Sequence, residues 1–257
     1  MGMARSMGMD MGRSKNLLFC TLLLLFLSTN IQGSNFSGKF KKSNFSLSSE
    51  LTTKYVWRGI EYGDAPVFFG TLNYDWKGLN AFVLGGYAVN GKHSEVDLGV
   101  SYAHKYFTLG LSDYYFPSAA GEKDKYFNFN GKETGHSLES YLILSPFEKF
   151  PLWFTLSTYV FGADKDLQGK QAYSSYIELG YLHAFNENNE LSLSVGANLN
   201  KSFYTQYESG FNVVNVTLKY LTNIPIGKFR LPVSGSLIFN PYINKPFFSL
   251  SLYLKSK

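Results

Sequence analysis

Hydrophobic and polar residues alternate one by one along most of this chain. Between 189 and 200, Leu191, Leu193 and Val195 alternate with polar or small neighbours, and 246–255 shows the same pattern. Successive side chains of a strand point to opposite faces, so each segment has one apolar and one polar face. The segments are roughly 10–13 residues long, close to the roughly 9–11 residues with which a tilted strand crosses a bilayer. The pattern predicts a transmembrane β-barrel.

We predict an all-β fold made of a single closed antiparallel transmembrane β-barrel with about 12 strands. The predicted strands are 44–56, 65–76, 79–90, 94–104, 106–116, 136–145, 150–161, 172–185, 189–200, 211–223, 228–239 and 246–255.

The predicted connections differ in length at the two ends of the barrel. The turns at 77–78 and 104–105 are tight, whereas most links at the other end are longer, such as 57–66, 117–135 and 201–210. This division is typical of outer-membrane barrels, and an even strand number places both termini at the short-turn end. The long loop 117–135 is open to three interpretations: a constriction folded into the mouth, a binding site for an external ligand, or a plain surface loop.

Aromatic residues on the apolar faces cluster near both predicted strand ends, with aliphatic residues between them. Two such girdles are expected where strands cross a membrane. The short-turn girdle contains Phe45, Tyr74, Trp76, Tyr102, Phe107, Tyr181, Phe185, Tyr220 and Phe229, and the long-loop girdle contains Tyr55, Tyr87, Tyr115, Tyr173, Phe239 and Phe248.

The N-terminal segment has the pattern of a secretory signal peptide. Arg5, Arg13 and Lys15 precede the apolar run 17–27, which is too short to span a membrane as a helix. We therefore predict a signal peptide at 1–33, a periplasmic tail at 34–43 and an outer-membrane barrel at 44–257.

Composition excludes several classes of function. Cys20 is the only cysteine and lies in the predicted leader, so the mature chain has no thiolate chemistry. The formal net charge of +5 is too small and too scattered to indicate nucleic-acid binding. We expect no cofactor and no metal.

Several short motifs resemble the TorF-type porins of Gram-negative bacteria. The segment Lys54-Tyr55-Val56-Trp57-Arg58-Gly59-Ile60 resembles their opening strand, followed by matching Pro66, Gly70 and Tyr74. The segments 114–117 and 137–141, the latter with Glu139, are also similar, whereas Glu61-Tyr62 replaces the usual Ser-Gln. The resemblance implies an outer-membrane barrel, and it does not identify the solute.

Charged residues on the polar faces are candidates to line the lumen, because charge is costly toward lipid. They could orient small polar solutes in a transverse field, or fill the barrel as an interior salt-bridge network. The candidates are Glu50, Lys54, Arg58, Asp75, Glu95, Asp97, Glu139, Glu178, Lys219 and Arg230.

Large inward side chains are expected to narrow this lumen further, forming a constriction with Arg58 and Glu139. They are Phe69, Phe82, Tyr114, Phe116, Tyr141, Trp153, Tyr159 and Tyr176. By the same parity, the residues expected to face lipid are Leu98, Leu193, Val195, Leu218, Leu250 and Leu252.

An enzymatic function is disfavoured. A Ser–His dyad needs both side chains within hydrogen-bond reach. His104 and His183 fall on lipid-facing rim positions, while His93 and His136 fall in predicted loops.

The sequence thus predicts a narrow porin-like diffusion channel for small polar solutes in the outer membrane of a Gram-negative bacterium, reached by export through a cleaved signal peptide. Expected partners are outer-membrane lipid and lipopolysaccharide, the barrel assembly machinery and the solutes. The alternative is a closed barrel that serves as a surface binding or structural scaffold, and a barrel hydrolase is a less favoured third. Conductance, or lipid turnover for the hydrolase, distinguishes them.

Overall fold

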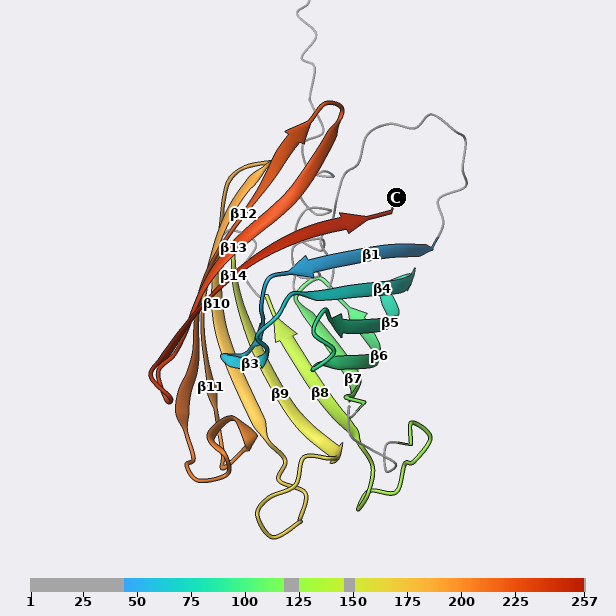
Figure 1. Ribbon diagram of the computed structural model, residues 1–257, viewed down its shortest axis with the longest axis vertical. Coiled ribbons are helices and arrows are strands. Elements are labelled where there is room, and N and C mark those ends of the chain that lie inside the picture. Colours follow the sequence, from blue (N-terminus) through green and yellow to red (C-terminus); the bar gives the residue numbers. More distant parts are fainter. Residues whose placement is uncertain (1–43, 118–124, 146–150, 257) are drawn as a thin grey trace, which may run out of the picture.

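The computed structural model describes residues 44–117, 125–145 and 151–256, which form a closed antiparallel barrel of 12 strands (Figure 1). The predicted signal peptide and periplasmic tail lie outside the described residues. The barrel strands are β1 (Phe45–Thr52), β4 (Val67–Trp76), β5 (Leu79–Ala88), β6 (Ser94–Ala103), β7 (Phe107–Tyr115), β8 (His136–Leu144), β9 (Leu152–Gly162), β10 (Ser175–Asn186), β11 (Asn189–Asn198), β12 (Asn212–Ile226), β13 (Phe229–Asn240) and β14 (Lys245–Lys255).

Strand β1 closes the ring by pairing with β4 on one side and β14 on the other. Phe45 lies opposite Tyr74, and Ser48 lies opposite Lys255. The predicted closed barrel is therefore confirmed, because no sheet edge remains in this ring. Apart from the short 3-10 helix η2 (Phe203–Thr205), the described residues are strands and connections, and they include no helix long and apolar enough to cross a membrane.

The first predicted strand, 44–56, is wrong at its end. Strand β1 stops at Thr52, and β2 (Tyr55–Trp57) and β3 (Ile60–Gly63) form a separate two-stranded sheet. Arg58 and Gly59 connect them with φ angles of 50° and 78°. Positive φ at both central residues is the geometry of a tight hairpin turn, so the chain reverses there instead of continuing in the wall. We call residues 53–66 the inner hairpin.

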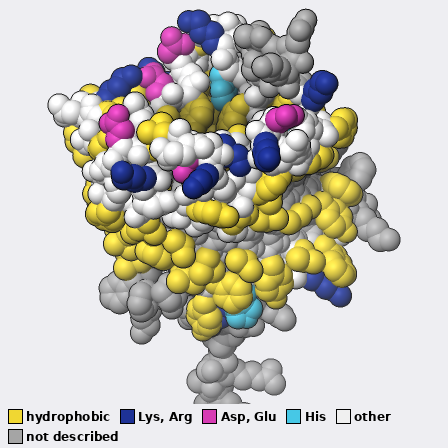
Figure 2. All heavy atoms as spheres, turned by 90° about the horizontal axis from the view of Figure 1, so that it is seen from below, with side chains coloured by type: hydrophobic (Ala, Val, Ile, Leu, Met, Phe, Trp, Pro, Cys, Tyr) yellow, Lys and Arg dark blue, Asp and Glu magenta, His cyan; other side chains and the backbone are white. Residues whose placement is uncertain are grey.

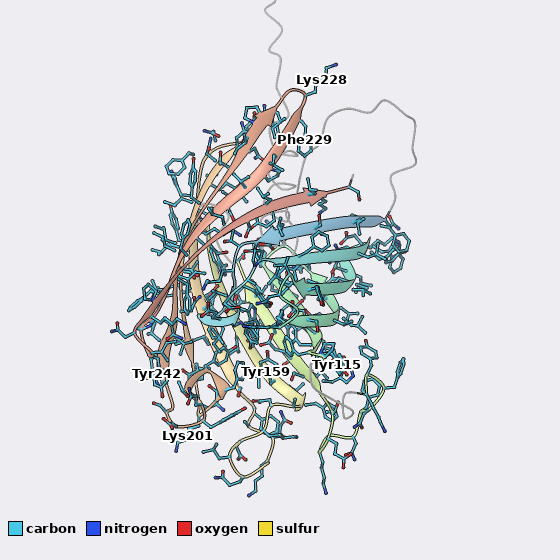
Figure 3. All side chains as sticks on the ribbon, in the orientation of Figure 1. Tyr115, Tyr159, Lys201, Lys228, Phe229 and Tyr242 are labelled. Carbon is cyan, nitrogen blue, oxygen red and sulfur yellow. The ribbon has the colours of Figure 1, made fainter. Side chains whose placement is uncertain are left out.

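The two ends of the barrel differ as predicted. Figure 3 shows Lys228 and Phe229, at the turn between β12 and β13, at one end of the molecule, and Lys201 and Tyr242 at the other. Strand β1 begins and β14 ends at the end that carries the tight turns, which we call the short-turn end. The inner hairpin starts from the opposite, long-loop end.

The predicted facing of the strands is confirmed on the outside. All six leucines and valines expected to face lipid are exposed, whereas Glu95 and Asp97 are buried. Figure 2 shows hydrophobic side chains in a band, with most of the visible charged side chains gathered toward one end. Water-soluble proteins rarely expose large apolar patches, so the exposed apolar band distinguishes this outer surface from theirs.

Inward aromatic rings lie flat along the wall, each against a glycine of the neighbouring strand. Phe82 lies opposite Gly99, and Trp153 lies opposite Gly180. A Cβ atom added at either glycine would be 2.1 Å or 1.9 Å from the ring, so the ring occupies that space. Phe69 over Gly86 and Tyr141 over Gly110 repeat the arrangement. These four rings occupy the space over their glycines, and three of them, Phe69, Tyr141 and Trp153, line the cavity inside the barrel.

Two residues of the predicted aromatic girdle are misplaced. Tyr55 belongs to the inner hairpin, because β1 ends before it. Tyr115 has the outward parity but is buried beside Tyr126 and His136. The remaining predicted girdle residues of the long-loop end are exposed, including Tyr87 and Tyr173.

The described part of the long loop, 125–135, packs on the outer side of β7 and β8. His136 opens β8, in agreement with the predicted strand 136–145 and not with its assignment to a loop, and it accounts for this packing. Its Nδ1 lies 2.7 Å from Asp113 Oδ2, and its ring stacks on Phe129. Tyr126 also contacts this ring, and its carbonyl oxygen lies within hydrogen-bond distance of His136 Nε2. This part of the loop therefore does not form the constriction that was one of the three interpretations; 118–124 lie outside the described residues.

Candidate functional site: the lumen and its inner hairpin

The inner hairpin crosses the lumen from the β1–β4 side to the opposite wall, as the position of β3 in Figure 1 also indicates. At its tip, Gly59 lies against β12 so closely that an added Cβ would be 1.9 Å from the Val214 carbonyl oxygen. Asn240 of β13 donates from Nδ2 to the Gly59 carbonyl oxygen at 3.1 Å. Ile60 packs against the buried cluster of Tyr176, Tyr204 and Val214. The tip is therefore docked by both shape and hydrogen bonding.

Arg58 at the hairpin tip is the polar centre of this docking. Its Nη1 and Nη2 atoms donate to the two carboxylate oxygens of Glu139, at 2.5 Å and 3.2 Å, and Nη1 also donates to the Tyr204 hydroxyl at 2.7 Å. The guanidinium carbon lies 4.2 Å from the Trp57 ring centre and 4.6 Å from that of Tyr176. Bidentate pairing with aromatic stacking is the preferred geometry of a buried arginine.

Burial and charge act in opposite directions on Arg58. Burial alone would lower its pKa, but the nearby Glu139 carboxylate raises the pKa well above the usual value for arginine. The guanidinium therefore stays charged, and Glu139, whose side chain is 1% exposed, has a permanent partner.

A second polar contact holds the outer arm of the hairpin. Glu61 of β3 forms ion pairs with two lysines, Lys54 at the start of the hairpin and Lys245 of β14. The Nζ atom of Lys245 lies 2.7 Å from Glu61 Oε2. Burial acts to raise the pKa of Glu61, but hydrogen bonds from Lys245 and Lys54 outweigh it and lower the pKa. Glu61 thus joins the hairpin to the barrel wall as a carboxylate.

Aromatic residues fill the space between the hairpin and the β4–β7 side. Tyr55 contacts Phe69 and His93, and Tyr62 stacks on Phe116. Beneath them, Glu95 is 3% exposed and lies 3.3 Å from His93 Nε2. This side of the lumen is filled by packed side chains.

The other side of the lumen contains a cavity of about 750 Å³. Its lining runs from Tyr55–Arg58 of the hairpin to Ser145 and Pro151 near the short-turn end. Hydroxyl and amide side chains from β1 and β9–β14 contribute much of the wall, including Thr52, Ser194 and Asn215. The barrel therefore holds a chamber on one side of the hairpin, lined by both polar and apolar side chains. Among the described residues, no group of three or more His, Cys, Asp or Glu side chains is arranged to hold a metal ion.

Several solved structures show a distant similarity of fold. They include a KdgM porin (7% identity, TM-score 0.46, covering 82% of this chain and 98% of that chain). The COG4313 outer membrane channel from Pseudomonas putida F1 is 11% identical, with a TM-score of 0.46, covering 86% of this chain and 98% of that chain. Salmonella typhi OmpF in complex with daunomycin is 7% identical, with a TM-score of 0.39 and coverage of 82% and 96%. These similarities are too distant to carry an argument about function. No protein-family model and no curated protein matches the sequence.

The ten predicted lumen candidates occupy three different environments. Asp75 and Arg230 are exposed at the short-turn end, where Asp75 accepts from Asn80 and Arg230 lies 3.7 Å from Glu187. Glu95 and Asp97 are buried on the filled side. The six that line the cavity are Glu50, Lys54, Arg58, Glu139, Glu178 and Lys219. Lys54 and Arg58 reach it from the inner hairpin, whereas the prediction placed Lys54 on a wall strand.

Sequence reasoning missed the docking partners of the hairpin. Tyr204 lies in η2 and Asn240 at the end of β13, both far from Arg58 in the sequence. The turn itself had a detectable signal, because a glycine that follows a polar residue between short apolar segments is typical of a two-residue hairpin. Only the contacts with the opposite wall show that this hairpin points inward.

Proposed function

We propose that this chain is a porin-like diffusion channel for small polar solutes in the outer membrane of a Gram-negative bacterium, exported through a cleaved signal peptide at 1–33. The exposed apolar band of the barrel supports insertion into lipid. Outer-membrane lipid, lipopolysaccharide and the barrel assembly machinery are its expected partners. The motifs around Arg58 that resemble TorF-type porins agree with this proposal.

The observation that carries the proposal is a cavity, lined in part by charged and hydroxyl side chains, inside a barrel whose outside is apolar. Twelve strands lie between the roughly eight that side chains can fill and the roughly 16–18 that leave an open channel. Here, aromatic rings lie along the wall and leave a chamber of about 750 Å³. The inner hairpin separates this chamber from the long-loop end, so it acts as the constriction that limits passage.

Single-channel recording of the refolded protein in planar bilayers tests this function. We expect small, stepwise conductance from the native protein, and a larger or more frequent current after Arg58→Ala, because that change weakens the docking of the hairpin. Uptake of sugars of increasing size into vesicles then gives the limit of solute size. Absence of current from both proteins would contradict the channel function.

The second candidate is a closed barrel that serves as a surface scaffold. The docking of the hairpin at its tip and at Glu61 favours it, because these contacts close one end of the chamber. A scaffold would stay silent in bilayers even when Arg58 is replaced. The same recordings therefore separate the two candidates.

A further inference from the structure

We propose that the chamber selects small organic cations and binds them at Glu178. This inference rests on the proposed function, because it names the class of solute that the same chamber admits.

The charges that line the chamber are not balanced. Four carboxylates line it, those of Glu50, Glu139, Glu178 and Glu190, together with the bases Lys54, Arg58 and Lys219. Glu139 is paired with Arg58, and Lys54 is paired with Glu61, which does not contribute to the lining. Glu61 is shared with Lys245, so the four lining carboxylates against three lining bases leave an excess of one negative charge. A cleft lined by one sign of charge attracts counter-ions.

Glu178 is oriented into this chamber by neutral groups. Its Oε2 atom accepts from the Tyr176 hydroxyl at 2.7 Å and from Asn215 Nδ2 at 3.1 Å. Both donors are buried, with exposed fractions of 1% and 5%. Neutral donors fix the position of a carboxylate and leave its charge uncompensated. No ion pair is formed by Glu178 within the described residues.

An aromatic ring borders the same part of the chamber. Trp153 lies opposite Gly180, and Glu178 is two residues before that glycine, on the same face of β10. The Trp153 ring lies flat against Gly180, so its plane follows the wall of the chamber. Diagonal neighbours on a sheet face are within reach of each other. A carboxylate beside an indole is the combination that recognises alkylammonium and guanidinium groups.

The arrangement favours an organic cation over a metal ion. A divalent metal needs several converging oxygen or nitrogen ligands, and the described residues hold no such group. An alkylammonium group needs one carboxylate and an aromatic surface, which Glu178 and Trp153 provide. The volume of about 750 Å³ accommodates such a solute together with water.

Choline is the probe for this site. We expect calorimetric titration of choline chloride into the refolded full-length barrel to show binding, and Glu178→Gln to weaken the affinity at least fivefold. In a bilayer with a choline chloride gradient, the native reversal potential should indicate cation preference, and Glu178→Gln should shift it toward chloride. The matched control is Glu133→Gln, which removes the same charge from an exposed loop position and should leave both measurements unchanged.

The two readouts separate this inference from the proposed function. Conductance with chloride preference, or equal choline affinity in the native protein and the Glu178→Gln variant, overturns the cation site and leaves the channel intact. Choline binding that depends on Glu178 in a barrel without current supports the site and overturns the channel. Retention of the folded barrel in each variant is checked by its resistance to denaturation by detergent at room temperature.

Discussion

Arg58 and Glu139 form a bidentate ion pair inside the barrel, with Nη1–Oε1 and Nη2–Oε2 distances of 2.5 Å and 3.2 Å. Arg58 comes from the hairpin that starts between β1 and β4, and Glu139 comes from β8 on the far side of the ring. The pair therefore joins the inner hairpin to a strand of the barrel wall. It is the contact that should decide whether the lumen is open.

Replacing Arg58 with alanine should release the hairpin tip. Breaking a buried ion pair on one side costs about 3–5 kcal/mol, because the remaining charge loses its partner. We expect higher open probability in single-channel recordings and a shift of ion selectivity toward cations, since Glu139 is left uncompensated. The double variant Arg58→Ala/Glu139→Gln is the control. It should keep the higher open probability and lose most of the selectivity shift. Unchanged gating and selectivity in the single variant would make the pair a structural contact only.

Free guanidinium should partly restore the closed state of the Arg58→Ala variant. Glu139 of β8, Tyr176 of β10 and Tyr204 of η2 lie outside the hairpin, so this cage stays when the arginine side chain is removed, and it is shaped for a planar cation. With Glu178 replaced by glutamine in both proteins, so that the chamber site does not contribute, we expect millimolar guanidinium to reduce the current of the Arg58→Ala variant in a saturable way and to leave the current of the protein with Arg58 unchanged. Tetramethylammonium has the same charge and no N–H donors, so it should act more weakly. Equal effects of the two ions would show that the cage does not recognise the guanidinium group.

Acid should weaken the second attachment of the hairpin. Hydrogen bonds from Lys245 and Lys54 lower the pKa of Glu61 in the docked state. The docked state therefore binds a proton less readily than the released state, so this contribution to docking is complete above the ordinary pKa near 4.5 and is lost as pH falls through the lowered value. We expect open probability to rise as pH falls below about 4.5. A Glu61→Gln variant should lack this rise, and an identical response in both proteins would assign it to another group.

Much of the wall was predictable because one physical rule governs it. Alternation with period two fixes both where a strand lies and which face is apolar, so β6 was predicted at 94–104 and is observed at Ser94–Ala103. The same rule placed Glu178 and Lys219 on the inner face, where both line the cavity. Arg58 and Glu139 were predicted to lie at one constriction, and the structure brings them into direct contact.

The inner hairpin could not be predicted by that rule. Tyr55 and Trp57 continue the alternation of β1, so the pattern looks like a longer wall strand. What removes them from the wall is the tight turn at Arg58-Gly59 together with the contacts to Val214 and Asn240, which are distant in sequence. The packing of aromatic rings on glycines likewise depends on which residues of two neighbouring strands lie opposite each other. The sequence of one strand does not specify this pairing.

Arginine placed on the outer face should be destabilising, and the same change on the adjacent inner position should not. Leu193 is exposed on the apolar band, and Ser192 lines the cavity. If Leu193 lies near the bilayer midplane, Leu193→Arg should cost roughly 2–4 kcal/mol. Urea unfolding of the barrel in lipid vesicles measures this, with Ser192→Arg as the matched control. Equal losses of stability at the two positions would contradict the assignment of the band to lipid.

Gly180→Ala should displace the Trp153 ring from the wall. The new Cβ would be 1.9 Å from this ring, and the indole is too large to stay in place. Overpacking of this kind typically costs about 1–3 kcal/mol. We expect a lower free energy of unfolding, a smaller single-channel conductance because the ring moves into the chamber, and a changed fluorescence emission from Trp153. Gly85→Ala is the control, because a Cβ at Gly85 has no atom within 4 Å and should alter none of the three measurements. A Gly180→Ala protein with native conductance and native stability would show that the glycine is not needed for the ring to lie flat.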